Sequence, residues 1–156
     1  MKRAQIVLIE DNRGDVTLIE LALRENGIDF ALTHFTTGVE AVGVLSGQSN
    51  DEVVHPDLIL LDLNTPRSDG FETLVALQQN PRFARVPIAI LTSSRARSDK
   101  HRAAMRGVRY IEKPVELNDF LVSVGGAVKE MLSAPTAKSA AAEHRSSIGS
   151  EKSDVA

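Results

Sequence analysis

Acidic residues, a threonine and a lysine follow four separate apolar runs of the sequence. They are Glu10 with Asp11, Asp62, Thr92 and Lys113. Taken singly, an acidic residue after a strand often only caps a helix or solvates a turn. Four coincidences favour a shared function instead, because the carboxyl ends of parallel strands meet at one sheet edge, where ligands bind.

Three carboxylates, a hydroxyl and an ammonium suit a magnesium site for phosphoryl transfer. Neighbouring carboxylates repel by roughly 1–4 kcal/mol per pair at ~4 Å, so three ionised groups need a cation among them. Oxygen ligands without His or Cys fit Mg²⁺, which keeps several waters and accepts a phosphate oxygen. One Asp can itself accept the phosphoryl group, while the metal and Lys113 neutralise charge on its oxygens.

Five short runs are expected to form the strands that position these residues. Three runs are continuously apolar, as in parallel strands covered on both faces. These are residues 6–9, 58–61 and 88–91, and two weaker candidates are 31–35 and 109–112. Helix-period segments alternate with them, at 15–25, 39–45, 71–79, 100–105 and 117–131. The order predicts an α/β fold, a doubly wound parallel sheet with right-handed crossovers and helices on both faces.

Composition limits the class of protein. The chain has 156 residues, 42% of them hydrophobic, a formal charge of −3 and no cysteine, which predicts one domain with a real core. The acidic balance gives no electrostatic footprint for nucleic acid or membrane, and disulfides and thiolate zinc sites are excluded. The first apolar run is too short for a signal peptide, which needs roughly 7–15 residues. We therefore expect a cytoplasmic, soluble protein.

The composition changes near the C-terminus, where 12 of the 24 residues from Ser133 to Ala156 are Ala or Ser. Such a segment buries too little surface to offset its ordering entropy. We expect one domain over residues 4–131 and a flexible tail over 132–156. The alternative is a dimerisation arm that orders only on a partner or a second copy. No output domain is expected in the tail.

Four motifs in order resemble the receiver domain of two-component response regulators, over about residues 4–131. They are Ile9-Glu10-Asp11-Asn12, Leu61-Asp62-Leu63-Asn64-Thr65-Pro66 with Asp69-Gly70, Leu91-Thr92-Ser93, and Tyr110-Ile111-Glu112-Lys113-Pro114. The resemblance implies the flavodoxin-like strand order 2-1-3-4-5. It also implies a regulatory phosphoacceptor, not an enzyme, with at most Mg²⁺-dependent phosphorylation and dephosphorylation of itself.

The resemblance assigns roles to the acidic residues. Asp62 would accept a phosphoryl group from the phosphohistidine of a sensor histidine kinase. Asp11, Asp62 and the backbone carbonyl of Asn64 would bind Mg²⁺ directly, and Glu10 would act through water.

The resemblance also implies a switch. Lys113 would pair with the phosphate and precede a cis bond to Pro114. Thr92 would move to the phosphate and Tyr110 would turn inward with it, changing the surface made by the fourth helix, fifth strand and fifth helix.

A finer likeness concerns Glu10-Asp11-Asn12-Arg13-Gly14-Asp15-Val16 followed by Leu18-Ile19-Glu20. This segment looks like the branch that serves phytochrome-type and related hybrid sensor kinases, although Arg13 stands where Pro is usual. That branch is mostly receiver-only and tends to form dimers. It implies a homodimer, a phytochrome-type sensor histidine kinase as partner, and output through protein contacts or a histidine phosphotransfer protein.

Three other functions fit these residues less well. A haloacid-dehalogenase-like aspartyl-phosphate hydrolase needs a second acid two residues after the nucleophile, and that position is Asn64. A flavodoxin-like cofactor carrier needs a hydroxyl- and Gly-rich phosphate loop, where Glu10 and Asp11 would repel the phosphate. A binding module that is never phosphorylated would not need Asp62, Thr92 and Lys113 together.

Six basic residues surround the predicted fourth helix: Arg95, Arg97, Lys100, Arg102, Arg106 and Arg109. A solvated face explains them most simply, and a dimer or partner contact is the alternative. No recognition-helix motif or stacking aromatics accompany them, so no nucleic-acid partner is expected. The four histidines show no metal-ligand spacing.

Overall fold

The computed structural model describes residues 2–47, 55–65 and 69–134. Five parallel strands form one sheet in the order β2-β1-β3-β4-β5, as expected. The strands are β1 (Ala4–Ile9), β2 (Phe30–Phe35), β3 (Leu58–Leu61), β4 (Ile88–Thr92) and β5 (Arg109–Glu112). The predicted α/β, doubly wound receiver fold is confirmed.

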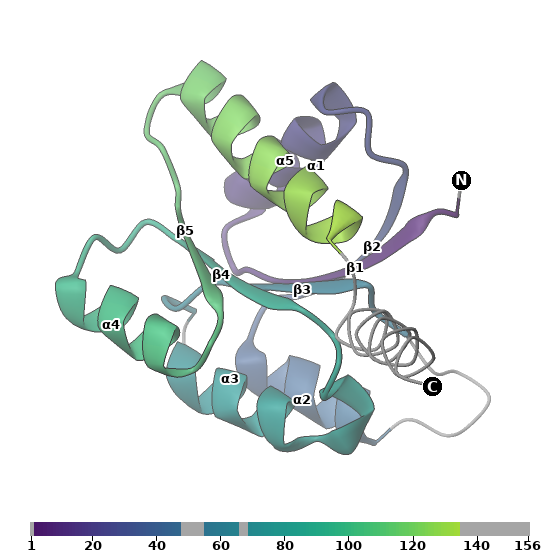
Figure 1. Cartoon of the computed structure of the whole chain (residues 1–156), viewed down its shortest axis with the longest axis vertical. Coiled ribbons are helices and arrows are strands. Elements are labelled where there is room, and N and C mark those ends of the chain that lie inside the picture. The colour runs from purple at the N-terminus through teal and green to yellow at the C-terminus, as the bar shows by residue number, and fades with distance from the viewer. Residues whose placement is uncertain (1, 48–54, 66–68, 135–156) are drawn as a thin grey trace, which may run out of the picture.

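Helices cover both faces of the sheet (Figure 1). Those described are α1 (Arg13–Glu25), α2 (Gly38–Ser46), α3 (Gly70–Gln79), α4 (Arg97–Met105) and α5 (Leu117–Ser133), with a short 3₁₀ helix, η1 (Pro81–Phe83). Helices α1 and α5 lie on one face, and α2, α3 and α4 on the other. The periodicity placed all five helices, but α4 begins three residues earlier than predicted and η1 was not expected.

The core forms two layers because alternate strand residues point to opposite faces. Ile6 and Leu8 of β1 pack with α1 and α5, whereas Val7 and Ile9 pack with α2, α3 and α4. All four side chains are at most 1% exposed. Burial on both faces explains why these four residues of β1 form a continuous apolar run.

Strand pairing brings the ends of separate strands to one edge of the sheet. The backbone N–H of Asp62 donates to the carbonyl of Ile9 at 3.0 Å, and that of Lys113 donates to the carbonyl of Thr92 at 2.8 Å. Glu10 follows Ile9 directly. The backbone register therefore fixes where these polar side chains emerge.

Local signals set the helix ends. Asn12 Oδ1 accepts from the backbone N–H of Asp15 and begins α1, and Thr37 Oγ1 accepts from that of Glu40 and begins α2. Gly27, with φ +70°, ends the turn after α1, in the left-handed conformation that favours glycine after a helix.

The bond before Pro114 corrects one expectation. The described residues contain no cis peptide bond, so Lys113–Pro114 is trans and the cis prediction is wrong. The trans form is the default, favoured by about 0.5–1 kcal/mol even before proline.

The predicted tail over 132–156 lies almost wholly outside the described residues and stays a prediction. None of the described helices has the length and apolar character to span a membrane.

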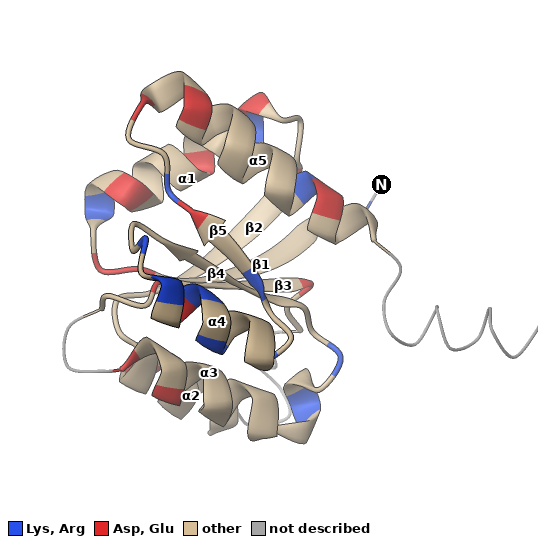
Figure 2. Cartoon of the chain, turned by 60° about the vertical axis from the view of Figure 1, so that its left-hand side comes forward, with Lys and Arg blue, Asp and Glu red and all other residues tan. Residues whose placement is uncertain are grey.

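The basic residues around α4 are largely engaged with neighbours. Figure 2 shows the Lys and Arg segments along this helix. Arg95 and Lys100 both pair with Glu112, at 2.6 and 3.4 Å, and the Arg102 guanidinium lies 3.9 Å from the centre of the Phe71 ring. These contacts favour the solvated-face interpretation, while a partner contact at α4 stays a prediction.

Candidate functional site

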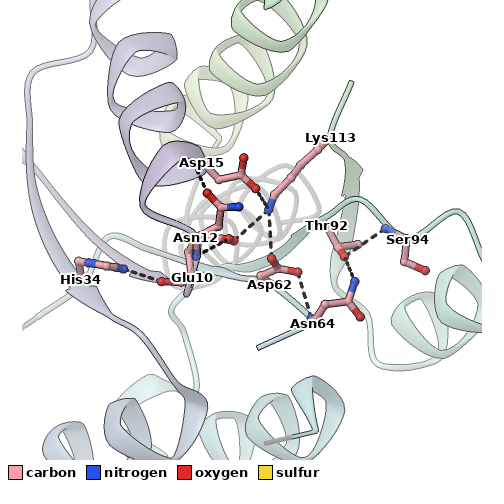
Figure 3. A network of polar contacts seen from close by, with 9 residues as sticks. All are labelled: Glu10, Asn12, Asp15, His34, Asp62, Asn64, Thr92, Ser94 and Lys113. Atoms are coloured by element: carbon pink, nitrogen blue, oxygen red, sulfur yellow. Dashed lines mark hydrogen bonds and ion pairs between the residues drawn. The ribbon is translucent and has the colours of Figure 1, made fainter. Parts of the chain in front are cut away.

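Lys113 lies at the centre of the predicted site. Its ammonium nitrogen is 2.9 Å from Glu10 Oε2, 2.9 Å from Asp15 Oδ2 and 3.0 Å from Asp62 Oδ2. Figure 3 shows these side chains converging, Glu10, Asp62 and Lys113 from just after β1, β3 and β5 and Asp15 from α1. Three donors meet three carboxylates, so the hydrogen-bonding capacity of the ammonium is used in full.

The charges of this cluster are mostly removed from water. Glu10 is 1%, Asp62 5% and Lys113 7% exposed. Desolvating such groups is costly unless they are paired and hydrogen-bonded. Within the described residues no buried side-chain nitrogen or oxygen lacks a hydrogen-bond partner, so Lys113 supplies the compensation that the buried carboxylates require.

Burial and neighbouring charge shift the pKa values of these groups in different directions. Burial raises the pKa of Glu10 to about 8, and Asp62 adds to the rise while Lys113 opposes it. Burial alone would raise the pKa of Asp62, but Glu10, the Lys113 charge and the Asn64 N–H hold it below its usual value. The pKa of Lys113 lies above its usual value, because its carboxylate partners outweigh burial. Asp62 is thus the ionised carboxylate of the pair near neutral pH.

Glu10, Asp11 and Asp62 form a candidate metal site. Each offers a carboxylate oxygen within 4.8 Å of the others, and Asp11 is exposed. An all-oxygen, mostly anionic donor set fits a hard divalent cation, which retains waters where the protein supplies few ligands. The exposed Asp11 leaves one side of the site open to solvent.

Asp62 is held in a fixed orientation. Its Oδ1 accepts from the backbone N–H of Asn64 at 3.1 Å, while Oδ2 faces Lys113. The Asn64 side chain donates to Thr92 Oγ1 at 3.4 Å, and Thr92 is fully buried. Asn64 therefore bridges Asp62 and the hydroxyl of Thr92, the predicted switch residue.

Ser94 links Thr92 to Tyr110 and α4. Its backbone N–H donates to Thr92 Oγ1 at 3.2 Å, and its carbonyl accepts from the Tyr110 hydroxyl at 2.6 Å. The Ser94 hydroxyl donates to Asp99 Oδ2 at 2.6 Å, in the first turn of α4. These contacts connect the buried threonine to the helix surface.

The structure gathers the residues predicted from sequence at one edge of the sheet. Glu10, Asp62 and Lys113 are in contact, Asp11 completes the acidic group, and Thr92 lies beside them through Asn64. Tyr110 does not reach the carboxylates and contacts Ser94 instead. The described contacts leave untested the metal-binding role predicted for the Asn64 carbonyl.

Three contacts were missed by the sequence reasoning. Asp15, Ser94 and His34, whose Nε2 is 2.6 Å from the Glu10 carbonyl oxygen, were given no role. A signal existed for Asp15, because the third residue after a helix cap at a strand's carboxyl end lies at the same edge. His34 contacts the backbone carbonyl of Glu10, and Ser94 contacts Thr92 and Tyr110 through its own backbone groups, which sequence spacing does not reveal.

Comparisons with known proteins agree with this geometry. The family model described as response regulator receiver domain matches residues 6–124. The chain is 36% identical over 123 residues to the response regulator Rcp1 of Synechocystis sp. (strain ATCC 27184 / PCC 6803 / Kazusa), covering 78% of this chain and 84% of that protein. It resembles the crystal structure of the phosphorylated cyanobacterial phytochrome response regulator RcpA, with a TM-score of 0.78 and 32% identity over 87% of this chain and 99% of that chain. A Mn²⁺-bound structure of Rcp1 matches with a TM-score of 0.76 and 33% identity, over 85% of this chain and 97% of that chain.

Proposed function

This chain belongs to the response regulator receiver family, and from that premise we propose that Asp62 is its phosphoacceptor. One observation supports this assignment above the others. Asp62 is a buried carboxylate with one oxygen facing Lys113 and with two further carboxylates beside it. The partner that this function requires is a sensor histidine kinase.

The geometry supports a direct transfer to Asp62. An Asp62 oxygen forms a bond to phosphorus as the bond between phosphorus and the donor nitrogen breaks, and the donor histidine keeps the electron pair. Lys113, within 3.0 Å of Asp62 Oδ2, is placed to pair with a phosphoryl oxygen. Thr92 offers a hydroxyl to another oxygen after it leaves Asn64.

Receiver domains use a divalent cation, and we propose Mg²⁺ for this chain. Glu10, Asp11 and Asp62 would hold it, and when bound it supplies positive charge to the transferring phosphoryl group. Mn²⁺ is the ion named for the related Rcp1 structure. Oxygen donors alone suit Mg²⁺ equally well.

We propose that the chain is not an enzyme that turns over external substrates. A phosphatase of the dehalogenase type needs an acid to protonate its leaving group. The residue two positions after Asp62 is Asn64, whose N–H groups donate to Asp62 and Thr92. Asn64 has no acidic proton, so the reactions expected are phosphorylation and dephosphorylation of the chain itself.

The comparisons guide the choice of partners. RcpA is a cyanobacterial phytochrome response regulator, and a bacteriophytochrome response regulator, RtBRR, matches with a TM-score of 0.67 and 28% identity. We propose a phytochrome-type kinase as donor, a homodimer as the assembly, and a protein target or histidine phosphotransfer protein as the recipient. We also propose a cytoplasmic location, because the ATP that such a kinase uses is found there.

Intact-protein mass spectrometry after incubation with acetyl phosphate and Mg²⁺ tests the phosphoacceptor. We expect one phosphoryl adduct on the wild type, none with EDTA and none on Asp62→Asn. Asp29→Asn is the matched control, because Asp29 precedes β2 and lies at the opposite edge of the sheet. Absence of an adduct on the wild type, or an undiminished adduct on Asp62→Asn, contradicts the proposal.

A further inference from the structure

Lys113 has a carboxylate partner that lies outside the acidic cluster. Asp15 Oδ2 is 2.9 Å from Lys113 Nζ, as close as Glu10. The converging oxygens of the candidate metal site come from Glu10, Asp11 and Asp62, and Asp15 is not among them. Among the described partners of Lys113, Asp15 alone is left out of that group.

The start of α1 fixes the position of Asp15. The backbone N–H of Asn12 donates to Glu10 Oε1 at 3.2 Å, and Asn12 Oδ1 accepts from the backbone N–H of Asp15 at 3.1 Å. The Asp15 side chain is 30% exposed, against 6% for that of Lys113. Figure 3 shows it reaching the lysine nitrogen from α1, whereas Asp62 approaches from β3. Asp15 is therefore a rim residue anchored by the same cap that contacts Glu10.

A divalent cation held by the acidic cluster would change the surroundings of Lys113. Glu10 and Asp62, which the ammonium contacts in this structure, would then share their carboxylates with the cation. Because like charges repel, the ammonium would also be pushed away from Asp62. The Asp15 carboxylate lies outside the cluster, so it would remain available to pair with Lys113 alone.

We propose that Asp15 is a positioning residue, which holds the Lys113 ammonium beside Asp62 when a divalent cation occupies the acidic cluster. This inference rests on the proposed function. The proposed role of the Asp15 carboxylate goes beyond stabilising the ion-pair network. Lys113 then stays within reach of the incoming phosphoryl group.

A simple charge effect predicts the opposite result. Acetyl phosphate is an anion, so removing a negative charge near Asp62 eases its approach and raises the labelling rate. Loss of positioning lowers the rate instead, because Lys113 no longer neutralises the phosphoryl oxygens. The direction of the change separates the two explanations.

The rate constant of labelling by acetyl phosphate at saturating Mg²⁺ tests the proposal. In this reaction an Asp62 oxygen bonds to phosphorus while the phosphorus–oxygen bond to acetate breaks and acetate leaves. We expect Asp15→Asn to slow labelling by about tenfold and Asp15→Glu, which keeps the carboxylate, to recover part of the loss. In a Lys113→Met background, Asp15→Asn should cause no slowing, as a double-mutant cycle requires for residues that act together.

A second readout follows the ammonium itself. In ¹⁵N-labelled protein, the Lys113 ammonium signal is assigned by its absence from Lys113→Met. We expect this signal in wild type with and without Mg²⁺. In Asp15→Asn we expect it without metal, which also reports intact packing, and expect its loss when Mg²⁺ is added.

Each contrary outcome is distinct. An unchanged or faster rate in Asp15→Asn, equal slowing in the Lys113→Met background, or an ammonium signal that survives Mg²⁺ in Asp15→Asn overturns the positioning role. If wild type itself takes no phosphoryl group, the proposed function fails instead.

Discussion

Lys113 Nζ lies 3.0 Å from Asp62 Oδ2, although 51 positions separate the two residues in the chain. They follow β5 and β3, with β4 between those strands in the sheet. Their side chains are only 6% and 7% exposed. The pair thus joins residues that follow β3 and β5, two strands that are not adjacent in the sheet.

Replacing Lys113 should expose how much the buried carboxylates depend on it. Lys113→Ala leaves Glu10 and Asp62 without their cation, and breaking a buried pair costs about 3 kcal/mol. We expect that loss in urea unfolding with EDTA and a partial recovery with Mg²⁺, which replaces the missing charge. Lys129→Ala, on the exposed side of α5, is the control and should change little. Equal stability of the two variants would contradict the structural role.

Lys113→Ala should also separate phosphorylation from switching. Some labelling by acetyl phosphate should remain, because Asp62 and the acidic cluster are intact. The activation-dependent change in self-association should be lost, because no ammonium is left to pair with the phosphoryl oxygens. Sedimentation with and without beryllofluoride measures this, and a normal activation-dependent change in Lys113→Ala would contradict the assigned role.

Glu10 should make the metal-free protein less stable as the pH rises. Its pKa is raised from 4.5 to about 8 in the folded chain, so the folded state binds more protons than the unfolded state between these values. The stabilising contribution is complete below pH 4.5 and is lost as the pH rises through about 8. The lowered pKa of Asp62 acts at more acidic pH and the raised pKa of Lys113 at more alkaline pH.

Urea unfolding in EDTA across this pH range measures the effect. Wild type should lose stability towards the alkaline end. Glu10→Gln, which cannot titrate, should show a flatter profile. The same slope in both proteins would exclude Glu10 as its origin.

The fold and the acidic site were predictable because they depend on patterns that the sequence displays directly. Continuous apolar runs such as Leu58–Leu61 mark strands buried on both faces, and the polar residues after them must share an edge. Asp15 was missed although its place three residues after Asn12 puts it at that edge, because its contact with Lys113 also depends on where the first turn of α1 points. Ser94 was missed because it acts through its backbone carbonyl and amide. The prediction of a cis bond before Pro114 was wrong because it came from family resemblance and had no local signal.

Tyr110 should couple the site to α4 through Ser94. Its hydroxyl donates to the Ser94 carbonyl at 2.6 Å, and Ser94 in turn contacts Thr92 and Asp99. Tyr110→Phe removes that bond, and we expect a loss of about 1 kcal/mol in the free energy of unfolding. It should also reduce the beryllofluoride-dependent change in hydrogen exchange of α4. A response of α4 equal to that of wild type would show that Tyr110 is not part of the switch.

The packing of α1 on α5 gives a matched pair of glycine substitutions. A Cβ on Gly125 would lie 2.6 Å from the Ala22 carbonyl oxygen and would displace Asn26, whose amide donates to the Ala22 and Leu121 carbonyls at 2.8 and 3.0 Å.

Gly125→Ala should therefore lower the free energy of unfolding by about 2–3 kcal/mol, through overpacking and lost hydrogen bonds. A Cβ on the next residue, Gly126, meets nothing within 4 Å. Because alanine favours a helix interior over glycine, Gly126→Ala should raise the free energy of unfolding by about 0.5–1 kcal/mol. Urea unfolding of the two variants measures the difference directly. Effects of the same sign would mean that α1 and α5 do not approach as closely at Gly125 as the structure has them.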